Sequence, residues 1–390
     1  MNFDKPIDRR NTYSAKWEAL EPVYGLSPED GLAMWVADMD FAPGDFLQDA
    51  VRKLLERANY GYFSERDRFN HATAWWMQNR HNCQIDPDWC FTTHGLGNGI
   101  ALILQAFTDP GDKVAIFTPV YHEFSLKIGR AGRQSTEFPL IKVDGVYRMD
   151  FDAYQAMLDG SEKMVIFCSP HNPAGRVWSA AEITELCEFC ARNDLILLAD
   201  EIHQDLVFSG HKHLSTQTIA KGITDRLILT TSASKTFNIA GTRTGCVIVP
   251  DPETHKVFDH VFNALNIQPN LFGVELGCAA YSPEGAKWVD QLVPYLEGNY
   301  RLFAEGINAI PGVSLMPMQG TYLSWIDFAG TGMDFKEIWR RVVEVAKIAP
   351  TPGPGLGTGG ETCVRINIGT QRANIVKAVD RLKDAFSDLQ

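Results

Sequence analysis

The sequence predicts an α/β fold built around a mostly parallel sheet. Short apolar runs alternate with amphipathic stretches through the middle of the chain. These runs lack the polar–apolar alternation of a half-exposed strand, which indicates a sheet covered on both faces. The chain has 390 residues, of which 45% are hydrophobic, so it can bury a large core.

Five apolar runs are predicted to form the buried strands, over residues 113–119, 163–170, 195–201, 226–232 and 245–251. A helix is predicted over 180–192, because Ser179 and Glu182 match a capping box at its start. Within it, Cys187 and Cys190 share an apolar stripe with other residues at helical spacing. We therefore interpret this CxxC pair as core packing and not as a redox site.

The pattern of predicted secondary structure changes after about residue 285. The stretch "GVSLMPMQGTYLSWIDF" (312–328) predicts two strands joined by a turn, and "CVRINIG" (363–369) predicts another strand. The chain closes with an amphipathic helix over 373–386, and the Gly/Pro-rich stretch 350–360 predicts a loop. This part reads as a smaller α+β domain packed on the sheet domain.

The charge balance limits the classes of partner. The chain carries 36 basic and 48 acidic residues, a net charge of −12, and has no Lys/Arg block. We therefore expect no nucleic acid and no anionic membrane as a main partner. No apolar run approaches the roughly 18 residues of a membrane span, and residues 1–17 lack the apolar core of a secretory signal. A cytoplasmic location is the expectation.

Polar side chains follow three of the predicted strands at their carboxyl ends. Asn172 follows the strand at 163–170, Asp200 ends the run "LILLAD", and Lys235 follows "LILTTSAS". Ligands of open α/β sheets bind at this edge, so we expect the three side chains to lie together.

A lysine, a carboxylate and an amide in one site match the needs of pyridoxal 5′-phosphate (PLP). A lysine in an apolar setting has a lowered pKa and can bind a carbonyl covalently as its neutral amine. A carboxylate can pair with a protonated pyridine nitrogen, and an amide can bind a phenolic oxygen. The "GLGNG" turn (95–99) lacks the third glycine of a dinucleotide fingerprint, since Ile100 stands there. His203, His211 and His213 are too weak a pattern to predict a metal, so we expect none.

Motifs spread over the whole chain resemble those of the fold-type-I PLP enzymes, the aspartate aminotransferase superfamily. Within it, the chain is most similar to the cystathionine β-lyase (cysteine-S-conjugate β-lyase) subfamily of the MalY/PatB type. The resemblance rests on "MWVADMDF" (34–41), "YGYF" (60–63), "PGDKV" (110–114), "TPVYHEF" (118–124), "SPHNPAGRVW" (169–178), "DEIHQDLVFSGHKH" (200–213), "SASKTFNIAG" (232–241), "QGTYLSWIDF" (319–328) and "VRINIG" (364–369). It implies a large PLP-binding domain over 45–285 with a mostly parallel seven-stranded sheet, and a small domain from 1–44 and 286–390.

The resemblance also implies a role for each residue of the site. Lys235 would bind PLP covalently and act as the catalytic base, and Asp200 would pair with the pyridine nitrogen. Asn172 and His203 would bind the phenolic oxygen, and Tyr121 would stack on the ring. The phosphate would meet Gly95, Leu96, Gly97, Ser232, Arg243 and, across the interface of a homodimer, Tyr62 of the second subunit. The substrate would contact Arg365, which would hold its carboxylate, and Ala37, Tyr121 and Asn172.

The function that the resemblance implies is β-elimination from cystathionine or a related cysteine S-conjugate, as in cysteine and methionine metabolism. An aminotransferase acting on an amino acid and a 2-oxo acid is the alternative, because Arg243 occupies a position where aminotransferases have an arginine for the phosphate. His122 stands where many of these lyases have a second tyrosine. A PLP-binding regulator is a third hypothesis, against which the presence of Lys235, Asp200 and Arg365 argues.

Overall fold

A seven-stranded sheet forms the centre of the structure, a computed structural model that describes residues 1–389. The strands of this sheet are β2 (Cys90–Thr93), β3 (Lys113–Thr118), β4 (Gln134–Pro139), β7 (Glu162–Cys168), β8 (Ile196–Asp200), β9 (Leu227–Thr231) and β10 (Gly245–Ile248). Their order in space is β2-β10-β9-β8-β7-β3-β4. The strands from β9 to β4 are parallel to their neighbours, whereas β10 is antiparallel to both β9 and β2.

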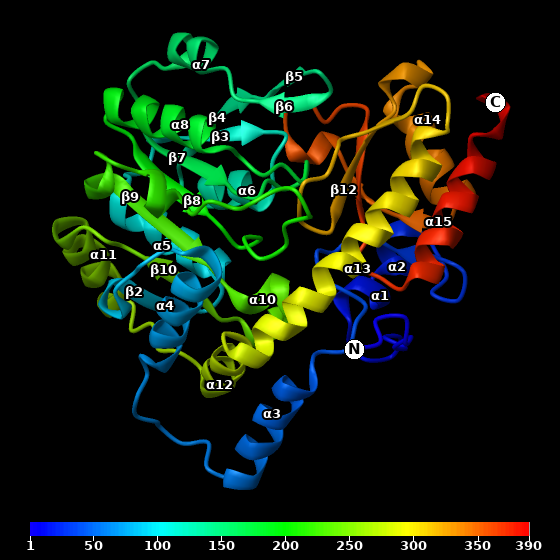
Figure 1. Ribbon diagram of the computed structural model, residues 1–390. Coiled ribbons are helices and arrows are strands. Elements are labelled where there is room, and N and C mark those ends of the chain that lie inside the picture. The colour runs from blue at the N-terminus through cyan, green and yellow to red at the C-terminus, as the bar shows by residue number, and fades with distance from the viewer. Residues whose placement is uncertain (390) are drawn as a thin grey trace.

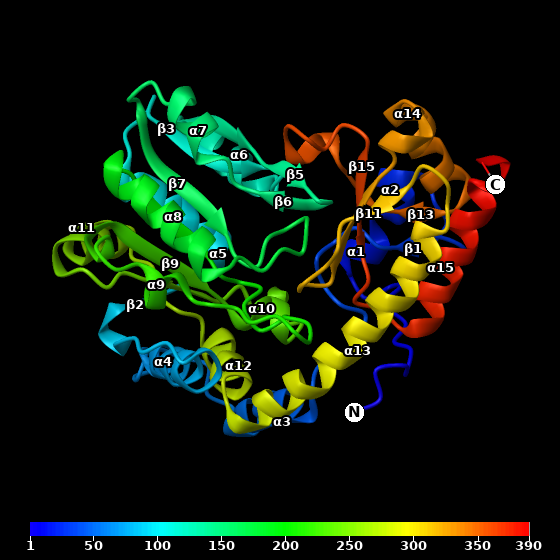
Figure 2. The same ribbon diagram turned by 45° about the horizontal axis from the view of Figure 1, so that its top comes forward.

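Helices lie against both faces of the sheet (Figures 1 and 2). The α-helices of the whole chain, in sequence order, are α1 (Ala15–Glu18), α2 (Leu20–Tyr24), α3 (Asp45–Arg57), α4 (Arg68–His81), α5 (Leu96–Phe107), α6 (Glu123–Arg130), α7 (Phe151–Met157), α8 (Ala180–Arg192), α9 (Thr216–Ile219), α10 (Ala233–Thr236), α11 (Pro252–Ala264), α12 (Leu271–Ala280), α13 (Pro283–Asn308), α14 (Phe335–Trp339) and α15 (Arg372–Ala385). In β3, Val114 and Ile116 join an apolar cluster with α5, α6 and α11. The alternate residues Ala115 and Phe117 join a second cluster with α4 and α8. Both faces of the strand are therefore buried, as the unbroken apolar runs predict.

A smaller antiparallel sheet lies beside the C-terminal part of α13 (Figure 2). Its order is β11 (Ser314–Leu315), β12 (Leu323–Asp327), β15 (Cys363–Asn367) and β14 (Thr351–Pro352). The N-terminal segment joins this part of the molecule, because β1 (Leu32–Ala33) pairs in parallel with β13 (Ile348–Ala349). A hairpin of β5 (Ile141–Val143) and β6 (Val146–Arg148) completes the strands.

Helix α13 connects the two sheets and packs along α15 (Figure 1). The helices approach closely at Gly306, where a Cβ atom would lie 2.2 Å from a methyl carbon of Val379. The strands of the larger sheet all fall within residues 45–285 and those of the four-stranded sheet within 286–390. A two-domain division at residues 44 and 285 agrees with this arrangement and stays a prediction.

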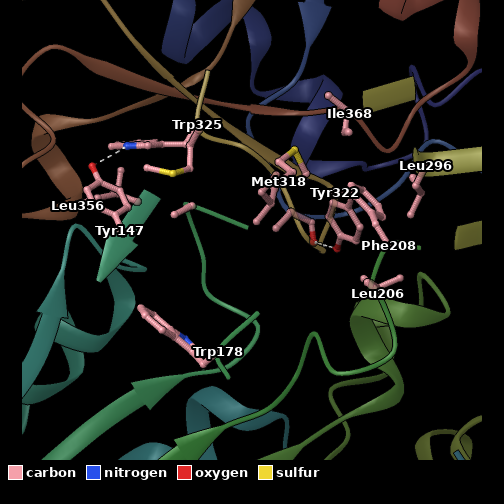
Figure 3. Packing of buried hydrophobic residues seen from close by; sticks show 14 of the residues in the cluster. Tyr147, Trp178, Leu206, Phe208, Leu296, Met318, Tyr322, Trp325, Leu356 and Ile368 are labelled. Carbon is pink, nitrogen blue, oxygen red and sulfur yellow. Dashed lines mark hydrogen bonds between the residues drawn. The ribbon is translucent and has the colours of Figure 1, made fainter. Parts of the chain in front are cut away.

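Side chains from both parts of the chain meet in one apolar cluster, shown in Figure 3. Trp325 of β12 donates a hydrogen bond from Nε1 to the hydroxyl of Tyr147 in β6, at 3.2 Å. Leu356, from the Gly/Pro-rich stretch, is buried in the same cluster. The cluster fixes the two sheets relative to one another beside the edge at which the polar residues lie.

The five predicted strands are confirmed to within three residues at each end, and the predicted helix at 180–192 is confirmed with the same bounds. Ser179 and Glu182 form the capping box, and Cys187 and Cys190 are buried. Two strands of the sheet, β2 and β4, were missed. The prediction of a loop over 350–360 is wrong for Thr351 and Pro352, which pair with β15. No helix among residues 1–389 is both long and apolar enough to cross a membrane.

Candidate active site

A cavity of about 640 Å³ opens where β7, β8 and β9 end. Ten of the residues predicted to bind cofactor or substrate line it: Ala37, Gly95, Leu96, Gly97, Tyr121, Asn172, Asp200, His203, Lys235 and Arg243. The strand order explains this convergence, because β7, β8 and β9 are adjacent and parallel. Side chains that follow them therefore meet at one edge of the sheet.

Lys235 lies on the short helix α10, which begins two residues after β9 ends. Ser232 caps this helix and accepts a hydrogen bond from the backbone N–H of Ser234. The Lys235 ammonium donates to the carbonyl oxygen of Ala37 at 2.8 Å. Burial, reinforced by the charge of Arg365, lowers the pKa of Lys235 to about 8. A substantial share of the amine is thus neutral near physiological pH, which is the form that attacks a carbonyl.

Asp200 is the last residue of β8 and is almost fully buried. Burial raises its pKa to about 6, and the backbone N–H of Ile202 donates to the carboxylate at 3.2 Å. Burial and the nearby Lys235 lower the pKa of His203 to about 3, so this imidazole is neutral. Its Nδ1 atom has no hydrogen-bond partner among residues 1–389. The cavity therefore offers a buried carboxylate, which favours a cationic partner, and a neutral imidazole with a free polar atom.

Arg365 lies on β15, directly behind Asn172. Its guanidinium donates to Oδ1 of Asn172 at 2.9 Å, and to the Trp35 carbonyl and the Thr351 hydroxyl, also at 2.9 Å. The side chain is buried, and burial lowers its pKa to about 10. Within residues 1–389, its hydrogen-bond partners include no carboxylate, and its Nε atom lacks a partner. A buried cation without a counterion indicates that an anion binds here.

The opposite end of the cavity is formed by the start of α5. Gly95 precedes this helix with a φ of +77°, which a residue with a side chain adopts only under strain. Leu96 and Gly97 form the first turn, where backbone N–H groups point out of the helix and favour an anion. Arg243 lines the same end. A phosphate fits these groups, just as a pyridine nitrogen fits Asp200 and an aldehyde fits Lys235.

Residues 35–41 form a segment, here called the strap, that contacts Lys235 and lines the cavity at Ala37. The Ala37 carbonyl accepts hydrogen bonds from Lys235 and from the hydroxyl of Tyr322 at 2.9 Å. Asn367 donates to the carbonyls of Val36 and Asp38 on either side of Ala37. The strap is further held by Asn238, which bonds to Met39 and Phe41, and by Arg365 and the buried Lys16. Its backbone at Ala37 is thus fixed from both sheets.

Three predicted residues do not line this cavity. Arg365 lies behind Asn172, and Ser232 is buried with its hydroxyl donating to the carbonyl of Thr244 at 2.7 Å. Tyr62 is fully exposed and lines a separate hollow with Tyr60. Sequence reasoning also missed cavity residues, among them Ser234, Glu123 and Lys127. The spacing of the last two, four residues apart just after Tyr121, is the signal that could have found them.

The chain is similar to known proteins over nearly its whole length. Residues 39–382 match the family model described as aminotransferase class I and II. The chain is 34% identical to cystathionine β-lyase PatB of Bacillus subtilis (strain 168), covering 99% of this chain and 100% of that one. It is 29% identical to the protein MalY of Escherichia coli (strain K12), with 99% of each covered.

A solved structure extends the likeness to three dimensions. Cystalysin from Treponema denticola, whose crystal structure contains pyridoxal 5′-phosphate, superposes with a TM-score of 0.94 at 32% identity, covering 100% of this chain and 99% of that one. The fold is thus the aspartate-aminotransferase-like α/β fold that the motifs predict. On the extent of the family match and of these likenesses, the chain belongs to the class I and II aminotransferase family.

Proposed function

We propose that the protein is a PLP-dependent carbon–sulfur β-lyase that converts cystathionine or a related cysteine S-conjugate to a thiol, pyruvate and ammonia. The observation that carries the proposal is the buried Lys235, which lies in one cavity with Asp200, Asn172 and the anion-binding turn at Gly95. The names of the relatives support the type of reaction, since cystathionine β-lyase PatB is similar over its whole length.

PLP, when bound, supplies an electron sink for the negative charge that develops at the substrate Cα. Lys235 would hold it covalently, and Asp200 would pair with its pyridine nitrogen. The neutral amine of Lys235 would also serve as the base that takes the Cα proton of the substrate, a transfer worth about 10²–10⁴ in rate. Asn172 and His203 would bind the phenolic oxygen, and Tyr121 would cover the ring. The overall reaction would consume one water molecule and give a thiol, pyruvate and ammonia.

Substrate orientation is assigned to Arg365 and the strap. Arg365 has two nitrogens held by protein oxygens and a free Nε, so it can bind a carboxylate without losing its position. The Ala37 backbone lies at the same edge and is fixed by Tyr322 and Asn367. These contacts would hold a substrate carboxylate at the edge of the cavity where Lys235 lies.

Aminotransferase activity is the second candidate, and Arg243 favours it. This arginine lines the phosphate end of the cavity, as expected of an aminotransferase. The same residues serve both reactions, which differ in whether the β-substituent leaves or the proton returns to the cofactor.

The test is the number of pyruvate molecules released per bound cofactor from cystathionine and from S-alkylcysteines, without any 2-oxo acid. Many turnovers are expected for a β-lyase. Less than one pyruvate per cofactor, with conversion of PLP to pyridoxamine phosphate, would establish an aminotransferase. No reaction with any amino acid by a PLP-loaded protein would support a regulator.

Replacement of Arg365 with alanine is expected to raise the KM for the amino-acid substrate about 100-fold, because a buried charged contact is lost. The kcat is expected to change less than tenfold, since Lys235 and Asp200 remain. Steady-state kinetics with equal cofactor loading measure both constants, and Arg301→Ala, an exposed arginine of α13, is the control. An unchanged KM would refute the proposal that Arg365 binds the substrate carboxylate.

The pKa of Lys235 predicts how fast the cofactor-free protein takes up PLP at different pH values. Only the neutral amine reacts, and half of the lysine is neutral when the pH equals its pKa of about 8. The rate of covalent uptake, followed by stopped-flow absorbance between pH 6.5 and 10, is therefore expected to have its midpoint near pH 8 and to level off about one pH unit higher. A rate that still climbs at pH 10 would mean that the lysine keeps an ordinary pKa.

A homodimer is part of the proposal, with Tyr62 reaching the phosphate of the second subunit. Tyr62 is fully exposed in the single chain and lies beside the exposed, stacked rings of Tyr60 and Phe272. Exposed aromatic clusters of this kind are typical of protein interfaces.

All eight cysteines are free thiols, which supports a reducing compartment such as the cytoplasm.

A further inference from the structure

We infer that Lys127 is a further residue that binds the cofactor phosphate. This inference rests on the proposed function, because it assumes that PLP occupies the cavity of Lys235. Lys127 lies on α6, where neither the sequence motifs nor the roles described above place a phosphate ligand. Its side chain lines the same cavity as the anion-binding turn at residues 95–97.

The position of the ammonium group is defined by Gly97. A Cβ atom built on Gly97 would lie 3.0 Å from Cε and 3.3 Å from Nζ of Lys127. The ammonium therefore packs against the first turn of α5, at the end of the helix where N–H groups attract an anion. The glycine provides the space that the lysine occupies.

The surroundings of Lys127 contain a single acidic partner. Its Nζ atom donates to Oε2 of Glu123, one turn earlier on α6, at 2.6 Å. The charged hydrogen bond from Lys127 holds the pKa of Glu123 below its usual range, so this carboxylate is ionised. Glu123 leaves donors of the ammonium free, because an ammonium has three and the bond to Oε2 uses one.

A helix-stabilising contact is the alternative explanation of an ion pair at this spacing. Burial argues for more. The side chains of Lys127 and Glu123 are 19% and 28% exposed, whereas the comparable pair Lys256–Glu253 on α11 is 70% and 81% exposed. Partial burial of a charged pair costs free energy of desolvation, which a bound phosphate would offset. Arg243 lines the same cavity and adds a second cation to it.

Glu123 then has the role of holding Lys127 in place when no phosphate is bound. Because the carboxylate repels a phosphate, removing its charge is not expected to weaken PLP binding. The two members of the pair therefore make opposite contributions to phosphate binding. A purely structural ion pair would make its two members equivalent.

The test compares the Kd of PLP for the variants Glu123→Gln and Lys127→Met and for the double variant. The assay measures cofactor absorbance and not turnover. Lys127→Met is expected to raise the Kd about tenfold, the loss of one charged hydrogen bond to phosphate. The double variant is expected to bind PLP about tenfold more weakly than Glu123→Gln alone. Arg130→Met, which removes the same charge from the exposed end of α6, is the control and is expected to leave the Kd unchanged.

Pyridoxal, which lacks the phosphate, identifies the group that Lys127 binds. Its Kd is expected to be the same for the wild-type protein and for Lys127→Met. Equal weakening of PLP binding by Glu123→Gln and Lys127→Met would overturn the inference in favour of a structural ion pair. A raised KM for the amino acid with an unchanged Kd for PLP would overturn it in favour of a substrate contact. Failure of the wild-type protein to bind PLP would instead refute the proposed function itself.

Discussion

Replacement of Lys235 with alanine is expected to lower pyruvate release by roughly 10⁴-fold, the largest effect of any single substitution in the chain. The variant loses both the covalent attachment of PLP and the base that takes the Cα proton. Its cavity is otherwise kept, because the carbonyl of Ala37 still has the hydroxyl of Tyr322 as a donor. The loss is therefore one of chemistry and not of fold.

Two measurements separate these contributions. Borohydride treatment followed by mass spectrometry is expected to show attached cofactor in the wild-type protein and none in Lys235→Ala. Lys336→Ala, an exposed lysine on α14, serves as the matched control and is expected to keep both the attachment and the rate. Turnover by Lys235→Ala within tenfold of the wild-type rate would refute the central assignment.

Replacement of Asp200 with asparagine is expected to lower kcat by about 10³-fold, with a KM within a few-fold of the wild-type value. The amide has nearly the same shape and still accepts the hydrogen bond from Ile202, so the substitution removes mainly the negative charge. Without that charge the pyridine nitrogen is no longer held protonated, and the electron sink weakens. The buried position of Asp200 makes the effect large, because no solvent replaces the lost charge.

The Asp200 variant is measured at equal PLP occupancy, so that weak cofactor binding is not mistaken for slow chemistry. Asp152→Asn, an exposed aspartate in the first turn of α7, changes the net charge equally and is expected to be without effect. A fall in kcat of less than tenfold would mean that the pyridine nitrogen need not be protonated for this reaction.

The sequence was most informative where a buried strand ends in a polar residue. The strands β7, β8 and β9 are buried on both faces, so their apolar runs are unbroken and their ends are sharp. The sequence alone therefore predicts that Asn172, Asp200 and Lys235 lie at one edge of the sheet. The edge strand β4 gave no such signal, because "QSTEFP" is largely polar and ends in proline, as edge strands do.

Contacts between distant segments could not be read from local patterns. The pair of Lys127 with Gly97 depends on how α6 packs on α5, and a single sequence does not state the geometry of that contact. The strap is visible in the sequence only as the motif "MWVADMDF" (34–41), and this motif does not predict the hydrogen bonds that hold it. Tyr62 could be named from the resemblance, but the contact proposed for it depends on a second chain, and a local sequence pattern does not describe how two chains pack.

The strap has a consequence for the order in which the protein is made. Ala37 lies near the N-terminus, yet the donors to its carbonyl, Lys235 and Tyr322, follow it by 198 and 285 residues. Arg365, which binds the neighbouring carbonyl of Trp35, follows by 330 residues. A growing chain therefore cannot close the site until almost all of it has left the ribosome, and contacts this remote in sequence slow folding.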